Sequence, residues 1–183
     1  SKADYPIDDS ESDITALMWN GVGGGTIVYA AQWQRNMPSD FRVRTLDGVA
    51  DDWPLTYDEL EPYYDAFEYD IGASGIAGNL RGTIQPGGNP FEAPRSRGYP
   101  NPPLEVTPMG AMFADACEDL GLHPFTQPAG IASRAFVDGW GNHRSACLYC
   151  GFCTRFGCEV DAKASPVNTH LPPALETGRY EIR

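Results

Sequence analysis

The chain has 183 residues and a formal net charge of −12. This acidity argues against nucleic acid as a partner, because proteins that bind phosphate backbones concentrate Lys and Arg, and it leaves no basic patch for an anionic membrane surface. No apolar run reaches the length of a bilayer span, no signal peptide is recognised at the start, and the many Gly, Pro and aromatic residues indicate a loop-rich globular fold.

The first 18 residues are acidic and polar, and we expect an exposed lead-in. The next stretch, "WNGVGGGTIVYAAQWQR", joins a glycine cluster to an apolar run, which from Thr26 to Trp33 predicts a short buried helix or strand. Glycines allow tight turns and let backbone N–H groups approach a ligand closely. The cluster does not match G-x-G-x-x-G, because Thr26 stands where the third glycine is needed, so a simple flexible turn is an alternative.

A capping box at Thr56 and Glu59 predicts the start of a helix, and Gly72 is placed to end it. Pro62 predicts a kink in this helix, or its division into two short helices. Apolar residues recur at helical spacing between these points: Leu60, Tyr63, Tyr64, Phe67 and Ile71.

Residues 73–103 are rich in Gly, Pro, Asn and Ser, which predicts loops with short extended pieces. A second helix is expected from Thr107, its cap, to Gly121, with Cys117 as a buried thiol without a function. Its predicted apolar face consists of Met109, Met112, Phe113, Ala116 and Leu120. Further on, "THLPPALETG" predicts a short helix and "RYEIR" the start of a strand.

Four cysteines with the spacing C-x2-C-x2-C-x4-C follow the second helix: Cys147, Cys150, Cys153 and Cys158. Thiols this close together serve as iron–sulfur ligands, zinc ligands, disulfides or core residues. The even spacing favours the loop of an iron–sulfur protein over paired zinc knuckles, and disulfides two residues apart are strained. Zinc, disulfides and a structural role remain alternatives.

Three blocks of the sequence together resemble one family. They are "WNGVGGGTIVYAAQWQR", "DDWPLTYDELEPYYDAFEYDIGASG" and "CLYCGFCTRFGCEVDAKASPVNTHLPPALETGRYEIR", and they are spread over the chain from Trp19 to Arg183. In this order they resemble the glucose–methanol–choline (GMC) flavoprotein oxidoreductases, and the cysteine-rich version resembles the large subunit of bacterial gluconate, sorbitol and fructose dehydrogenases. The resemblance implies an internal fragment with an α+β, loop-rich partial GMC fold. Its expected parts are a lead-in with a flavin-contacting segment (1–52), a substrate-domain segment (53–141) and the cysteine cluster with the return to the FAD domain (142–183).

The resemblance also implies the residues that contact FAD: Asn20, Val22, Gly23, Gly24, Gly25, Thr26, Tyr29, Lys163, Ser165, Asn168 and Thr169. Many family members carry Asn or His where this chain has Tyr29, and His can bond the flavin covalently. We therefore expect FAD to be held non-covalently. The alternative for residues 163–169 is the start of a helix, with Lys163 as a solvated charge and Asn168 or Thr169 as the cap.

The same resemblance implies a three-iron, four-sulfur cluster on three of the four clustered thiolates, with Cys158 expected to be the spare one. The expected activity is oxidation of a CH–OH group of a sugar or polyol, with electrons passing through the cluster to a cytochrome c subunit. The remainder of the polypeptide, a small subunit and the periplasmic side of the inner membrane belong to the same expectation.

The catalytic His of the family is expected outside this chain, since His123, His143 and His170 lie in no matching block. Alone, the segment should therefore be inactive. The alternative function is a standalone cysteine-rich module that binds a metal or cluster and carries electrons. The glycine block beside an aromatic helix disfavours it, because such a module has no use for that block.

Overall fold

The structure, a computed structural model, describes residues 7–14 and 19–182. Parts of the acidic lead-in, 1–6 and 15–18, and the last residue lie outside the described residues. Within 7–14 the chain has no helix or strand and is largely exposed, as expected. No helix among the described residues is long and apolar enough to cross a membrane.

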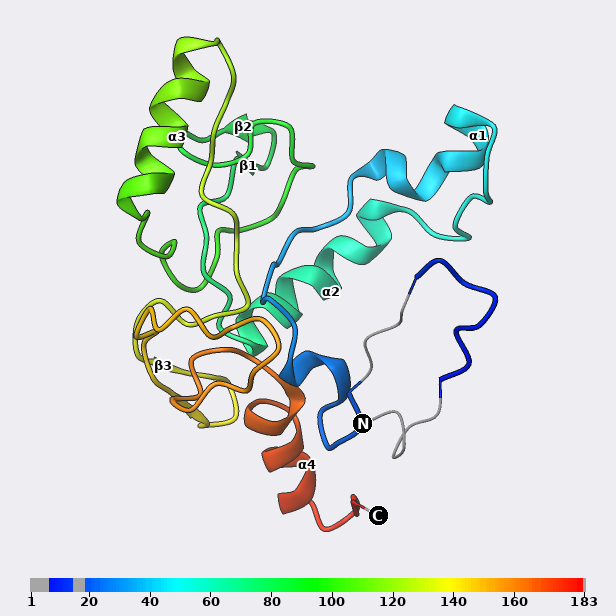
Figure 1. Cartoon of the computed structure of the whole chain (residues 1–183), viewed down its shortest axis with the longest axis vertical. Coiled ribbons are helices and arrows are strands. Elements are labelled where there is room, and N and C mark those ends of the chain that lie inside the picture. The colour runs from blue at the N-terminus through cyan, green and yellow to red at the C-terminus, as the bar shows by residue number, and fades with distance from the viewer. Residues whose placement is uncertain (1–6, 15–18, 183) are drawn as a thin grey trace.

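The fold mixes short helices and two small antiparallel hairpins with long loops (Figure 1). The α-helices are α1 (Val43–Asp47), α2 (Tyr57–Asp70), α3 (Pro108–Asp119) and α4 (Leu171–Glu176). Short 3-10 helices cover Gly24–Ile27, Pro38–Arg42 and Pro166–Asn168. Strand β1 (Asn79–Leu80) pairs with β2 (Thr83–Ile84), and β3 (Phe136–Val137) pairs with β4 (His143–Arg144). This arrangement agrees with the mixed, loop-rich α+β class predicted from the sequence.

Helix α2 begins at the predicted capping box. The Thr56 hydroxyl accepts a hydrogen bond from the Glu59 amide (3.3 Å), and the Thr56 amide donates to the Glu59 carboxylate (2.8 Å). The predicted division at Pro62 is wrong, because one helix runs through it. A proline removes the hydrogen bond to a single carbonyl, that of Asp58, and the remaining bonds of the 14-residue helix hold. Gly72, with φ of 64°, follows the last turn.

Helix α3 also begins and ends as predicted, with the Thr107 hydroxyl accepting from the Gly110 amide (3.1 Å) and Gly121 at φ 72°. Figure 1 shows it at the upper edge of the molecule. Its apolar face is open to solvent in the described structure: Met109, Met112, Phe113 and Leu120 are 70–79% exposed. For the same reason Cys117 is only half-buried, so its prediction as a buried thiol is wrong.

Small residues form the core where the loops meet. One cluster consists of Ala31, Ala129, Ile131 and Ala162, and a second contains Ile71, Ala73 and Ala164. Alanines allow backbones to pack closely, which suits a core built from crossing loops rather than from stacked layers. Only Ala31 is fully buried between Thr26 and Trp33, so this stretch is a 3-10 turn followed by a half-buried extended segment, not a buried element.

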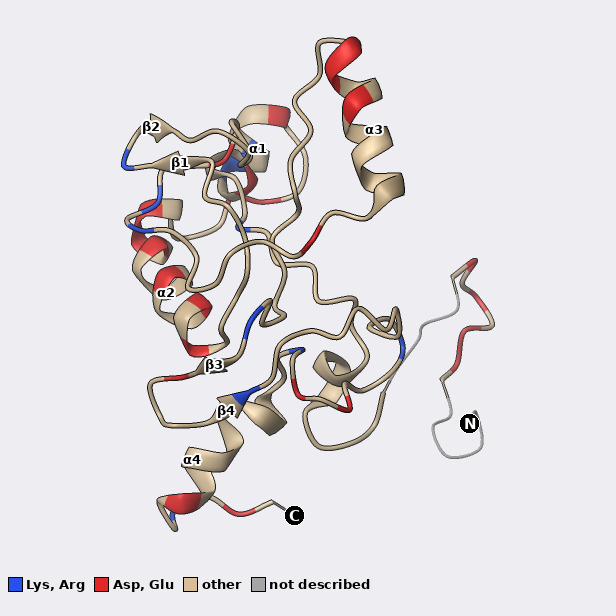
Figure 2. Ribbon diagram, turned by 90° about the vertical axis from the view of Figure 1, so that its left-hand side faces the viewer, with Lys and Arg blue, Asp and Glu red and all other residues tan. Residues whose placement is uncertain are grey.

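Carboxylates of α2 hold arginines from other segments against the helix. Figure 2 shows the acidic residues that recur along α2. Glu68 is completely buried and accepts from Arg35 Nε and Nη2, both at 2.8 Å, and from Arg95. A buried carboxylate needs such partners, because an unpaired buried charge costs several kcal/mol.

The predicted strand at the end of the chain is not formed within the described residues, where 179–182 have no strand partner. The short helix predicted just before it is present as α4. A strand requires a neighbour to bond its backbone groups, which the local sequence cannot supply.

Candidate functional site

The glycine segment, here residues 19–29, makes a tight turn that only glycine permits at its centre. Gly23 has φ of 91°, and a Cβ at this position would lie 2.7 Å from Ile27 Cδ1 and 2.9 Å from Val167 Cγ2. The Thr26 hydroxyl donates to the Gly23 carbonyl (2.5 Å) and closes the turn. Gly23 therefore allows the turn to pack against residues 163–169, which the sequence analysis also assigns to the flavin site.

Several predicted flavin contacts of the glycine segment lie on its open side. Asn20, Gly25 and Thr26 are exposed, and Val22 is 50% exposed. A Cβ at Gly24 or Gly25 would meet no atom within 4 Å. The backbone of this turn is thus accessible to a ligand.

Lys163 connects the glycine segment to the cysteine loop, here residues 147–158. Its ammonium nitrogen donates to the carbonyls of Ile27 (2.9 Å) and Tyr29 (3.0 Å) in the glycine segment. It also donates to the carbonyls of Cys153 (2.6 Å) and Phe156 (2.8 Å) in the cysteine loop. Lys163 is 3% exposed, so its interpretation as a solvated charge is wrong. Burial lowers the pKa of Lys163, and the neighbouring sulfur of Cys153 opposes that shift.

Tyr29 points inward from the glycine segment. Its hydroxyl donates to the Ala164 carbonyl (3.0 Å), and burial raises the pKa of Tyr29 to about 12. The phenol therefore stays neutral and holds the segment against residues 163–169, rather than presenting a reactive group at the surface.

The polar side chains of residues 165–169 largely bond one another. The Ser165 amide donates to Asn168 Oδ1 (2.9 Å), Asn168 Nδ2 donates to the Lys163 carbonyl (2.9 Å), and the Thr169 hydroxyl donates to the Ser165 carbonyl (2.7 Å). This is the helix-start geometry that the sequence analysis kept as the alternative, with Ser165 rather than Asn168 or Thr169 at the cap position.

An inner cavity of about 170 Å³ brings the two predicted sites together. Predicted flavin contacts from both ends of the chain line it together with one predicted sulfur ligand: Thr26, Lys163, Ser165, Asn168 and Cys158. A smaller neighbouring cavity is lined by Thr26, Tyr29, Ser165 and Thr169 among aromatic residues. The Arg155 amide also donates to the Val28 carbonyl (2.8 Å), so the cysteine loop and the glycine segment are in direct contact.

The four clustered thiols are free and unequal in their surroundings. Cys147, Cys153 and Cys158 pack against the first alanine cluster, whereas Cys150 is exposed. Burial raises the pKa of Cys153, the nearby Cys147 sulfur adds to this, and Lys163 opposes it. Three thiols therefore gather on one side of the loop, and the fourth turns to solvent.

A thiol cavity of about 640 Å³ opens beside these sulfurs. Its walls are mainly apolar and include three of the cysteines: Leu148, Cys150, Phe152, Cys153, Phe156, Gly157, Cys158, Glu159 and Val160. A donor set of free thiols around an apolar cavity fits the chemistry of an iron–sulfur cluster. However, no three His, Cys, Asp or Glu side chains in the described residues converge closely enough to hold a metal ion. The loop would therefore have to close around a cluster.

Of the three histidines, His170 lies in this region, where it lines the smaller neighbouring cavity. His123 and His143 are exposed. His170 packs between the rings of Phe67 and Trp140, at centroid distances of 5.1 and 5.0 Å. These are the structural or surface positions that the sequence analysis expected.

Arg144 is a site residue that the sequence analysis missed. It is 2% exposed, and its guanidinium donates to the carbonyls of Asp161 (2.5 Å) and Ala162 (2.7 Å) just before Lys163, and to that of Ile71 (3.2 Å) at the end of α2. Burial lowers the pKa of Arg144. Its only sequence signal is its position three residues before Cys147, which does not distinguish it from a surface arginine.

The chain is similar in sequence to known dehydrogenases. No protein-family model matches the chain. It is 33% identical over 135 residues to the gluconate 2-dehydrogenase flavoprotein of Pantoea cypripedii, an alignment that covers 72% of this chain and 22% of that protein. It is 33% identical over 177 residues to the 2-methyl-1,2-propanediol dehydrogenase of Mycolicibacterium austroafricanum, covering 96% of this chain and 29% of that protein. It is also 33% identical over 116 residues to the fructose dehydrogenase large subunit of Gluconobacter japonicus, covering 63% of this chain and 20% of that protein. The chain thus spans less than a third of the length of these relatives.

Proposed function

We propose that the chain is a segment of a GMC-type flavoprotein oxidoreductase, and that the protein it belongs to oxidises a CH–OH group of a sugar, polyol or sugar acid with FAD; the similarity to the gluconate, propanediol and fructose dehydrogenases supports this proposal. The single observation that carries this proposal is the inner cavity, where predicted flavin contacts from residues 20–29 and 163–169 lie beside Cys158. When bound, FAD supplies a hydride acceptor.

The residues of this chain would bind and orient that group. The backbone at Gly24 and Gly25 can approach it without a side chain in the way, and Gly25 is exposed. Lys163 and Tyr29 would act indirectly, because their polar atoms already bond backbone carbonyls and hold the turn in place. Tyr29 stands where family members can carry the histidine that bonds the flavin, so the proposed binding is non-covalent.

For electron transfer, we propose a three-iron, four-sulfur cluster on Cys153, Cys158 and one of Cys147 and Cys150. The sequence expectation took Cys158 as the spare cysteine, but Cys153 and Cys158 are the two thiols that both line the thiol cavity and pack on the first alanine cluster. Onward transfer to a cytochrome c subunit, association with a small subunit and a periplasmic location complete the proposal.

Anaerobic purification of the chain with iron and sulfide tests the cluster. We expect brown protein with broad absorption near 400 nm, roughly where iron–sulfur charge transfer falls. Cys153→Ser and Cys158→Ser should each remove the colour, whereas only one of Cys147→Ser and Cys150→Ser should do so and thereby identify the third ligand. Cys117→Ser on α3 is the control. Colourless protein with one bound zinc would overturn the cluster assignment.

The activity itself is tested on the whole polypeptide that contains this segment, purified with FAD. Sorbitol, gluconate and fructose should each be tried as donors to an artificial dye, and at least one should reduce it. Gly23→Val should abolish flavin retention, because its side chain would strike Ile27 and Val167, whereas Gly25→Ala should retain it. Full flavin retention in Gly23→Val would contradict the proposed role of the turn.

A further inference from the structure

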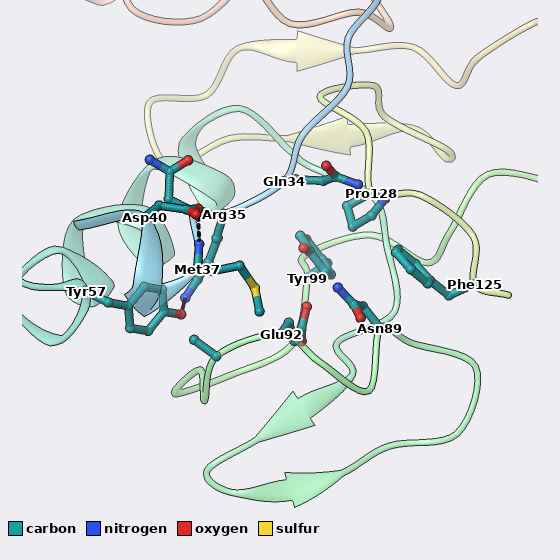
Figure 3. A pocket seen from close by; sticks show the side chains of 12 residues that line it. Gln34, Arg35, Met37, Asp40, Tyr57, Asn89, Glu92, Tyr99, Phe125 and Pro128 are labelled. Carbon is teal, nitrogen blue, oxygen red and sulfur yellow. Dashed lines mark hydrogen bonds between the residues drawn. The ribbon is translucent and has the colours of Figure 1, made fainter. Parts of the chain in front are cut away.

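A separate cavity of about 360 Å³, here the polar cavity, lies on the α2 side of the molecule (Figure 3). Its lining consists of Gln34, Arg35, Asn36, Met37, Asp40, Tyr57, Asn89, Glu92, Ala93, Tyr99, Phe125 and Pro128. Figure 3 shows Tyr57 and Arg35 on one side, and Tyr99, Glu92 and Phe125 on the other. No predicted flavin contact and no cysteine belongs to this lining. The volume is in the range of small-molecule sites.

The positive charge in the polar cavity is already matched. Arg35 is the one cation of the lining, and its Nε and Nη2 donate to Glu68, each at 2.8 Å. Its Nη1 donates to Glu61 (2.9 Å) and to the Tyr57 hydroxyl (3.2 Å). All three nitrogens of Arg35 are thus engaged by two carboxylates and a phenol, so none is free to bond an anionic ligand.

The negative charge in the polar cavity is not matched. Glu92 Oε1 accepts from the amides of Gly78 (2.5 Å) and Asn79 (3.0 Å), and Asp40 Oδ2 accepts from the Met37 amide (2.7 Å). In the described structure the second oxygen of each carboxyl group has no hydrogen-bond partner, and neither group is ion-paired; Asp40 is exposed and Glu92 is half-buried. Burial raises the pKa of Glu92, while the hydrogen bonds from those amides and the charges of Arg95 and Arg35 oppose the shift.

Neutral polar groups and rings complete the lining. The side-chain amides of Gln34 and Asn36, and the Nδ2 of Asn89, have no hydrogen-bond partner among the described residues. The rings of Tyr99 and Phe125 supply apolar surface. Free amides suit hydroxyl groups, and aromatic surface suits C–H groups or an organic cation.

We propose that the polar cavity binds a small hydroxylated amine, with its ammonium group held by the unpaired carboxylate oxygens of Glu92 and Asp40 and its hydroxyls held by the free amides. An anionic ligand is disfavoured, because the nitrogens of Arg35 are already bonded and two carboxyl groups line the cavity. This proposal does not depend on flavin binding, so its failure would leave the proposed oxidoreductase function untouched.

Three compounds that differ in one end group test the charge requirement: 1-amino-1-deoxysorbitol, sorbitol and gluconate. Each is titrated by calorimetry into the flavin-free chain at pH 7.5. We expect the amine to bind about tenfold more tightly than sorbitol, as one well-placed charge pair provides, and gluconate not to bind. Equal affinity for the amine and sorbitol, tighter binding of gluconate, or no binding of any of the three would each overturn the proposal.

Variants locate the binding. Glu92→Gln keeps the size of the side chain and removes its charge, so the advantage of the amine over sorbitol should fall about tenfold while sorbitol binding stays unchanged. Asp40→Asn, which keeps the oxygen that accepts from Met37, should reduce the same advantage and serves if Glu92→Gln does not fold. Glu118→Gln, an exposed carboxylate on α3, is the matched control and should change nothing. An undiminished preference for the amine in both cavity variants would contradict the assignment.

Discussion

A single buried ammonium group joins two parts of the chain that are far apart in sequence. Lys163 bonds four backbone carbonyls, two in the glycine segment and two in the cysteine loop. Its three N–H groups are shared among these four acceptors, so little hydrogen-bonding capacity remains for a cofactor. Lys163 is therefore best described as a positioning residue for both predicted sites.

Replacement of Lys163 by methionine should destabilise the protein strongly. Buried carbonyls that lose their donor cost about 1–3 kcal/mol each, so we expect the free energy of unfolding to fall by roughly 2–4 kcal/mol. Urea denaturation followed by tryptophan fluorescence measures this change. Arg155→Met removes an exposed charge from the same loop and should change stability by less than about 0.5 kcal/mol. Equal effects of the two substitutions would contradict the role of Lys163.

The role of Lys163 shows the limit of sequence reasoning at this scale. The sequence analysis assigned Lys163 to the expected flavin contacts, with a solvated charge as the alternative. Only the fold brings the carbonyls of Ile27 and Tyr29 to the lysine, because such pairs are set by long-range packing rather than by local pattern. The same holds for Arg144, for which the sequence gives no distinguishing signal.

At the scale of elements, the helices were the predictable part. The starts of α2 and α3 follow from Thr56 and Thr107, since capping is a local property of a few neighbouring residues. The wrong predictions concern features that depend on residues far away in the sequence. A strand at residues 179–182 needs a partner, and burial from Thr26 to Trp33 depends on which loops cross it.

Pro62 provides a test within α2. It is exposed and lies inside the helix, where a proline removes one hydrogen bond. Pro62→Ala should raise the free energy of unfolding by about 1–2 kcal/mol, since the restored bond outweighs the greater freedom of the unfolded chain. Thermal unfolding by circular dichroism measures the change. Pro86→Ala, in an exposed loop, should give no increase. A loss of stability in Pro62→Ala would mean that the ring makes a contact worth more than the missing bond.

At the scale of the whole molecule, apolar side chains remain exposed on several faces. Helix α3 provides a clear example with Met109, Met112, Phe113 and Leu120. Contiguous exposed apolar surface of this kind promotes association.

The double variant Met112→Lys with Phe113→Ser should therefore reduce self-association of the purified chain. We expect binding of a hydrophobic dye to fall about twofold and the sedimenting species to shift towards monomer. The control, Asp115→Lys with Glu118→Ser, alters exposed polar positions of the same helix and should keep the association. If the control and the apolar variant behave alike, the association is governed by net charge instead.

The hydrogen bond from Lys163 to Ile27 spans 136 positions of the chain. During synthesis on a ribosome, residues 23–26 are therefore translated long before Lys163. The turn cannot be anchored in its final conformation until Lys163 has been translated. Truncated products that stop before residue 163 would expose an unanchored glycine turn, which makes it an early target for proteases.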